Sequence, residues 1–119
     1  MYNSLNENLS SLKSAFANSA DFTVRDMILN SNKKTAAAVI TIEGMCSKEV
    51  IALSIINPIL DYDFKNADGT QILDEIRLSV LSASEIVEFE SFDEAIMFLT
   101  SGFAVIAVDG CSKMLAIGV

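Results

Sequence analysis

The sequence predicts one small domain of the α/β (α+β) class, in which helices cover a mixed sheet of about five strands. The strongest observation is the stretch from Phe103 to Val119, where two apolar runs flank Asp109-Gly110, a pair typical of a hairpin turn. Both runs are apolar at nearly every position, so we expect other layers to cover both faces of this hairpin. The length of 119 residues suits a single core, and the predicted domain is 1–119.

The first predicted helix runs from about Ser4 to Asn18. Its apolar positions recur at helical spacing and form one stripe, which consists of Leu5, Leu9, Leu12 and Phe16. A helix that lies over the domain is the simplest interpretation. The stripe is also our candidate subunit interface, although it is shorter than the three or four heptads that indicate a coiled coil.

An antiparallel hairpin is predicted next. Asp21 to Leu29 alternates in part, which places Phe22, Val24 and Met27 on one side of a strand, and the β-branched end of Thr35 to Ile42 favours a second strand. The polar segment from Asn30 to Lys34 would form the turn between them.

The middle of the chain is predicted to be helical. Cys46 or Ser47 would cap a helix to about Ile56, Asn57-Pro58 would break it, and a short further turn would follow. The segment from Asp61 to Gly69 is predicted to be a long, mobile polar loop. Thr70 would then cap another amphipathic helix.

A short strand and a helix complete the set. Glu85 to Glu90 predicts an edge strand, because its acidic residues would discourage further pairing. Ser91 and Glu94 stand at the spacing of a capping box, and Gly102 is a natural end for the helix that follows.

Composition excludes several classes of function. Sixteen acidic residues against eight basic ones give a net charge of −8, which disfavours binding to nucleic acid. No apolar run approaches the ~18 residues of a membrane span, and the N-terminus lacks the features of a signal peptide. Cys46 and Cys111 are expected to be reduced thiols.

No catalytic constellation is present. The chain has no His, so neither a Cys-His nor a Ser-His pair can form, and we expect no enzyme, no cofactor and no metal. Cys46 at a helix start could be an activated thiolate, but a small capping or core residue is the favoured interpretation. The carboxylates of Glu85, Glu88 and Glu90 are interpreted as solvent-facing charge, and Asp61, Asp63 and Asp68 do not complete a calcium loop.

Two acidic-glycine pairs are the candidate ligand-binding residues. Glu43-Gly44 and Asp109-Gly110 each follow a predicted strand directly, and turn chemistry explains both. If the two strands are neighbours, however, the pairs could line one small polar cleft at an edge of the sheet.

Short motifs spread over about a hundred residues resemble the N-terminal region of the A subunits of bacterial spore germinant receptors. They are Asp21 with Arg25, Ile42-Glu43-Gly44-Met45, Pro58-Ile59-Leu60, Asp93-Glu94-Ala95-Ile96 with Leu99 and Gly102, and Val108-Asp109-Gly110. One departure is Thr41 to Met45, where the family more often has Tyr-Ile-Asp-Gly-Leu.

The resemblance implies that the chain is the first soluble subdomain of a larger membrane protein, whose downstream helices anchor it. It implies residence at the inner membrane of the spore, on the cytoplasmic side, and assembly with B and C subunits. It also implies a share in sensing nutrients such as amino acids, sugars or nucleosides. No catalytic residue is carried over from the family.

Two other interpretations stay open at this point. The same region occurs in a related family of sporulation membrane proteins, which short motifs do not separate. A free-standing cytosolic module that binds a protein partner is the alternative from a different class, and it predicts a native chain without apolar spans.

Overall fold

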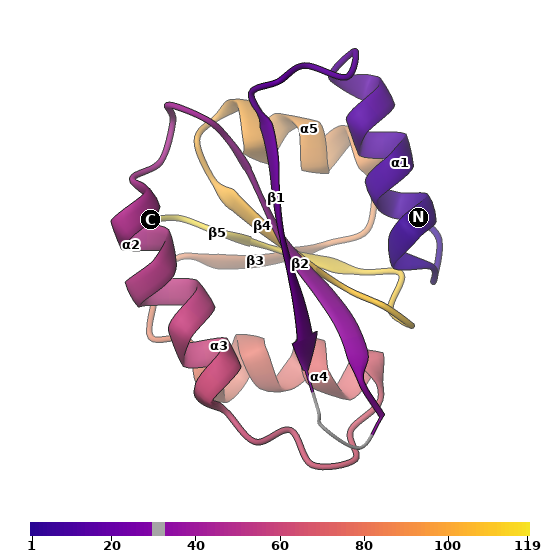
Figure 1. The fold of residues 1–119 in the computed structure, drawn as a ribbon, viewed down its shortest axis with the longest axis vertical. Coiled ribbons are helices and arrows are strands. Elements are labelled where there is room, and N and C mark those ends of the chain that lie inside the picture. The colour runs from indigo at the N-terminus through magenta and orange to yellow at the C-terminus, as the bar shows by residue number, and fades with distance from the viewer. Residues whose placement is uncertain (30–32) are drawn as a thin grey trace.

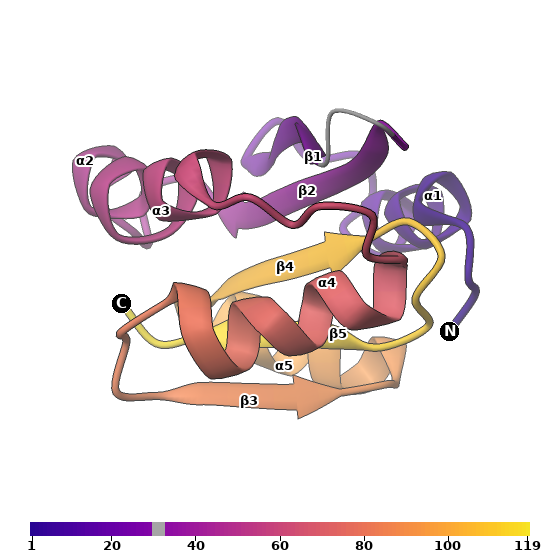
Figure 2. The same cartoon turned by 90° about the horizontal axis from the view of Figure 1, so that it is seen from below.

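Five strands form one sheet in the order β1-β2-β4-β5-β3. The computed structural model describes residues 1–29 and 33–119. Figure 2 shows the strands following one another from β1 to β3. Their bounds are β1 (Phe22–Leu29), β2 (Thr35–Ile42), β3 (Ile86–Phe89), β4 (Ala104–Val108) and β5 (Met114–Ile117). The predicted number of strands is confirmed, and β3 is an edge strand as expected.

The prediction of a mixed sheet is wrong, because all four neighbouring pairs are antiparallel. The reason lies in the connection through α5 (Phe92–Thr100), which joins β3 to β4. These two strands are parallel to each other, as a crossover helix requires, but β5 is inserted between them and pairs antiparallel with both.

The hairpin β4–β5 is the buried centre of the domain. Every residue of both strands is buried, which confirms the prediction that other layers cover the two faces. The turn at Asp109 and Gly110 is also confirmed, and Gly110 has a φ of 86°, a conformation that residues with a Cβ adopt only at a cost.

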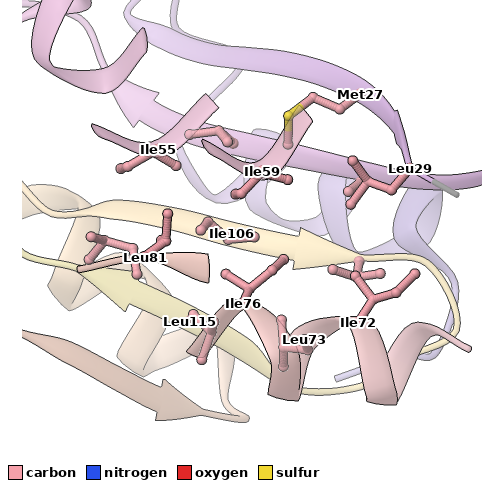
Figure 3. Packing of buried hydrophobic residues seen from close by; sticks show 14 of the residues in the cluster. Met27, Leu29, Ile55, Ile59, Ile72, Leu73, Ile76, Leu81, Ile106 and Leu115 are labelled. Atoms are coloured by element: carbon pink, nitrogen blue, oxygen red, sulfur yellow. The ribbon is translucent and has the colours of Figure 1, made fainter. Parts of the chain in front are cut away.

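Helices pack on both faces of the sheet (Figure 1). One face carries α1 (Leu5–Ala15) and α5. The other carries two longer helical stretches, which are α2 (Lys48–Ile51), η1 (Ala52–Ile56) and α3 (Asn57–Asp61), and then α4 (Gly69–Glu75) and η2 (Ile76–Val80). The larger of the two cores lies under these stretches, where Ile55 and Ile59 meet Ile106 of β4 (Figure 3).

The first hairpin, β1–β2, is formed as predicted, with Leu29 opposite Thr35. Of its predicted turn, Asn30 to Lys34, residues 30–32 lie outside the described residues. The expectation that Met27 shares a side with Phe22 and Val24 is wrong. Phe22 and Val24 belong to the core under α1 and α5, and Met27 belongs to the other core, because side chains alternate strictly along a strand.

Pro58 does not break the second helix, contrary to prediction. Residues 48–61 are helical without interruption, but the five residues before Asn57 form a π-turn, in which the N–H of Asn57 donates to the carbonyl of Ala52. Proline removes a donor and its ring crowds the carbonyl four residues earlier, and a widened turn relieves that conflict.

The caps are partly as predicted. Ser47, not Cys46, caps α2, and Ser91 caps α5 and also donates its hydroxyl to Glu94 at 2.9 Å. The cap of α4 is Asp68, which forms a capping box with Gln71, so the assignment to Thr70 is wrong. The loop before it is anchored by Phe64, whose side chain is only 3% exposed in the core.

Candidate functional site

The two acidic-glycine pairs lie at opposite ends of the sheet. Strands β2 and β4 are neighbours as required, but they are antiparallel, with Ala37 opposite Val108 and Ile40 opposite Val105. The N–H of Asp109 therefore donates to Ala36 at the start of β2, whereas Glu43 follows its end. Glu43 lies seven positions after Ala36 along this strand, a distance of roughly 23 Å. The prediction of one shared cleft is wrong.

Asp109 and Gly110 hold the N-terminal segment in place. The Asp109 carboxylate accepts a hydrogen bond of 2.9 Å from the N–H of Leu5, in the first turn of α1. The N–H of Gly110 donates to the carbonyl of Asn3 at 2.8 Å. A negative charge at this end of a helix is favourable, so the contacts explain both residues structurally.

Glu43 and Gly44, in contrast, line a cavity of about 150 Å³ between the sheet and the start of α2. Thr23 and Arg25 of β1 and Thr41 of β2 contribute its polar wall. Its apolar lining comes from Val39, Ile42, Cys46, Ile51 and Ile56.

The strand register explains why these polar residues gather. Thr23 lies opposite Thr41, and Arg25 lies opposite Val39. Residues of one parity share a face, so all four project from the face that α2 and η1 cover. Glu43 and Gly44 follow the end of β2 directly and line the same cavity as these polar residues.

The mouth of the cavity carries charges of both signs. Glu43 Oε1 lies 3.5 Å from Lys48 Nζ, and both side chains are largely exposed, at 52% and 85%. Within residues 1–29 and 33–119, Arg25 makes no ion pair or hydrogen bond through its side chain. An exposed ion pair contributes little stability and exchanges partners easily.

The thiol of Cys46 has a structural contact. Its Sγ donates to the carbonyl of Gly102 at 2.9 Å, and burial raises the pKa of the thiol above its ordinary value. A raised pKa is the opposite of what an activated nucleophile needs. Cys111 is also a free cysteine, and only 3% of it is exposed in the β4–β5 turn.

The predicted interface stripe is used inside the domain. Leu5 and Leu12 are buried at 4% and 0% exposure, and Leu9 and Phe16 pack against the same core beside α5. The interpretation as a helix that covers the domain is therefore correct for this stripe, and a subunit interface through Leu5 and Leu12 is contradicted.

An apolar surface that the sequence did not reveal lies on the outer side of residues 48–61. Val50, Leu53 and Leu60 are exposed at 41%, 69% and 43%, while Ile51, Ile55 and Ile59 of the same helix are buried. A groove beside this surface is lined by Leu53, Pro58, Val80 and Val119, among others. The spacing of Val50, Leu53 and Leu60 could have predicted this surface, because residues three and seven positions apart lie on the same side of a helix.

Neither a membrane span nor a metal centre is found in the described parts of the chain. No helix there has the length and apolarity to cross a bilayer. No group of three His, Cys, Asp or Glu side chains within those residues could hold a metal ion. Of the acidic residues before α4, Asp63 accepts from the N–H of Lys65 and Asp68 caps the helix.

Comparisons with known proteins give a family and a structural neighbour. The model of the GerA family, the Bacillus/Clostridium GerA spore germination proteins, matches residues 10–119. A solved structure, the N-terminal domain of the A subunit of the Bacillus megaterium spore germinant receptor GerK3, has a TM-score of 0.79 at 22% identity. The similarity covers 99% of this chain and 47% of the neighbour, so this chain spans about half of that domain. A search of curated proteins found no match.

Proposed function

Because this chain belongs to the Bacillus/Clostridium GerA spore germination protein family, we propose that it is part of the N-terminal domain of a germinant receptor A subunit, with roles in nutrient sensing and receptor assembly. The single observation that carries this proposal is the family match over residues 10–119. The agreement in fold with the receptor domain of Bacillus megaterium supports it independently.

The assembly role is assigned to the apolar outer surface formed by Val50, Leu53 and Leu60. Contiguous exposed apolar side chains on one helix face are unusual in a protein that stays alone in water, and they mark contact surfaces. We propose that the B and C subunits or the remainder of the A subunit cover this surface. The net charge of −8 argues against a lipid surface of the same sign as the partner.

The sensing role is assigned to the cavity beside Glu43 and Gly44. It is concave, mainly apolar and supplied with a few convergent polar groups, which is the usual composition of a small-molecule site. In this proposal the domain lies at the inner membrane of the spore, on the cytoplasmic side, and is held there by downstream membrane-spanning helices.

An antibody against this domain provides the first test. Immunoblots of fractionated spores and growing cells would record both the apparent mass and the fraction. We expect a band several times larger than 12.9 kDa, confined to spore membranes. A band at 12.9 kDa in the cytosol of growing cells would contradict the proposal and support a free-standing module.

Assembly is tested with two variants of the full-length subunit in spores. Leu53→Glu places a charge on the proposed contact surface, and Met97→Glu places one on α5, at an exposed position on the other side of the sheet. We expect Leu53→Glu to reduce the B and C subunits that co-purify with the A subunit and Met97→Glu to leave them unchanged. Equal recovery with both variants would exclude the B and C subunits as the partners of this surface.

A further inference from the structure

We propose that the outer edge of β1 accepts an extended segment of another protein, which adds to the sheet as a further strand antiparallel to β1. This inference goes beyond the proposed function and does not depend on it. It is argued from the backbone groups on this edge, the two charges of β1 and an apolar hollow beside its end.

One side of the β1 backbone faces away from the sheet. β1 pairs with β2 alone and lies at one end of the row of strands (Figure 2). The N–H of Glu43 donates to the carbonyl of Asp21, and in an antiparallel ladder such bonded pairs recur at every second residue. The N–H and C=O groups of Val24, Asp26 and Ile28 therefore point away from β2. Across the parts of the chain that the structure describes, these groups have no other hydrogen-bond partner.

The two edges of the sheet are built differently. β3 is four residues long, and its Glu88 lies 3.9 Å from Arg77 and 3.7 Å from Lys113. Short edge strands that carry charges resist the addition of another strand. β1 is eight residues long, contains no proline or lysine, and pairs with β2 in one continuous register. We infer that β3 is the protected edge and that β1 is the edge that accepts a strand.

Two neighbouring charges of opposite sign define the chemistry of the partner. Arg25 and Asp26 are both exposed, and neither forms an ion pair within the described ranges. Directly opposed side chains of an antiparallel pair share a face and interact, so the partner needs an acidic residue opposite Arg25 and a basic residue opposite Asp26. Because the partner runs in the opposite direction, its basic residue comes immediately before its acidic one.

A second copy of this chain does not meet that requirement. A twofold axis between two antiparallel β1 strands keeps the same face of both sheets on the same side, so residues of equal parity stand opposite each other. Arg25 then never lies opposite Asp26 of the other copy. A register centred on either residue would bring like charges together, which is unfavourable. The charge pattern therefore favours a different polypeptide.

An apolar hollow of about 270 Å³ lies beside the end of β1. Its lining includes the buried Leu29, Ile59 and Phe64 and the exposed Ile28, Leu60 and Tyr62. Leu29 points to the core under α3, so the partner residue opposite it lies on the same face, beside the hollow. An aliphatic side chain at that position would gain by burial. Strand addition at a sheet edge draws its affinity from main-chain hydrogen bonds and its specificity from such pockets.

The probe is the peptide acetyl-Leu-Val-Thr-Lys-Glu-Val-Thr-amide, designed to run antiparallel to β1. Its leucine would lie opposite Leu29, its lysine opposite Asp26 and its glutamate opposite Arg25. The peptide is titrated into the 119-residue chain labelled with ¹⁵N, and amide shifts and hydrogen exchange are recorded. We expect exchange to slow at Val24, Asp26 and Ile28, whose N–H groups gain a partner, and to change less at Arg25, whose N–H already bonds to β2.

Matched controls isolate the charge pairs. A peptide in which the lysine and the glutamate are exchanged keeps the composition but opposes like charges, so it should bind about fivefold more weakly or less. The double variant Arg25→Glu with Asp26→Lys should reverse this preference. The amide spectrum of the variant reports whether its fold is intact.

Two methylated peptides test the hydrogen-bonded geometry. N-methylation of the peptide lysine removes an N–H that faces β1, and it should abolish binding. N-methylation of the neighbouring glutamate removes an N–H that points away from β1, and most of the affinity should remain. This contrast distinguishes strand addition from adhesion of the peptide to an apolar surface.

Three outcomes would overturn the inference. The first is an unchanged spectrum of β1 up to the solubility limit of the peptide. The second is equal affinity for the two charge arrangements or for the two methylated peptides. The third is a change in the β1 amides when the chain alone is concentrated, which would assign this edge to a second copy.

Discussion

The carboxylate of Asp109 accepts a hydrogen bond from the backbone N–H of Leu5, a residue 104 positions earlier in the chain. The contact joins the turn of the central hairpin to the first turn of α1. It uses a carboxylate that sequence patterns had suggested for ligand binding, and it links the two ends of the chain.

Asp109→Ala should lower the free energy of unfolding by about 1–2 kcal/mol, because it removes the acceptor of the Leu5 N–H and a favourable charge at the start of α1. Asp109→Asn keeps an acceptor oxygen and should lose less. Urea titrations followed by circular dichroism measure both. An Asp109→Ala protein as stable as the wild type would show that this contact does not hold α1.

The two faces of the helix over residues 48–61 should respond differently to truncation. Ile55 is fully buried, and Ile55→Ala should cost about 2–5 kcal/mol of unfolding free energy. Leu53 is 69% exposed, and Leu53→Ala should stay within about 0.5 kcal/mol of the wild type. Thermal or urea unfolding of the isolated chain checks the pair. Similar losses in the two variants would contradict the orientation of this helix.

Gly69→Ala should destabilise the domain by about 1–3 kcal/mol, because the added Cβ would overlap the carbonyl oxygen of Asp109. Thr70→Ala is the matched control at the next position, which is exposed and does not cap the helix. It should be close to neutral in urea titrations. If Thr70→Ala lost more unfolding free energy than Gly69→Ala, Thr70 would instead be the residue that stabilises the start of α4.

Cys46 should resist alkylation and make stability depend on pH in the alkaline range. Burial raises the pKa of its thiol, so the folded state holds this proton more tightly than the unfolded state does. The unfolded state therefore binds fewer protons, and stability from this group is present below roughly pH 8.5 and falls as the pH rises beyond it.

Iodoacetamide labelling followed by mass spectrometry checks this across pH, with the urea-unfolded chain as the reference. Cys46→Ala removes the group, so its unfolding free energy should fall less between neutral and alkaline pH than that of the wild type. Rapid labelling of folded Cys46 at neutral pH would instead indicate an activated thiol.

Local patterns were sufficient for most of the secondary structure. The hairpin around Asp109-Gly110, the strand Thr35–Ile42 and the cap at Ser91 follow from turn chemistry, β-branched residues and capping signals. The prediction of a helix break at Pro58 is wrong. A proline breaks a regular helix, but the π-turn just before Asn57 accommodates its ring.

The candidate site was predictable only in part. Glu43-Gly44 could be singled out as a polar turn after a strand, but its neighbours Thr23, Arg25 and Thr41 depend on the pairing of β1 with β2. All three residues have odd numbers, so the sequence shows that Thr23 and Arg25 share one face of their strand. The register that brings them together with Thr41 at one cavity depends on the tertiary structure.

Sequence patterns predicted the class of the domain, its five strands, the covered central hairpin and the resemblance to germinant receptor subunits, because periodicity, turn residues and short motifs are local. The antiparallel pairing of β2 with β4 became known from the fold, and it places Glu43 at a cavity and Asp109 at the start of α1. Strand direction depends on how distant segments bury their apolar faces together, and a local pattern carries no information about that choice.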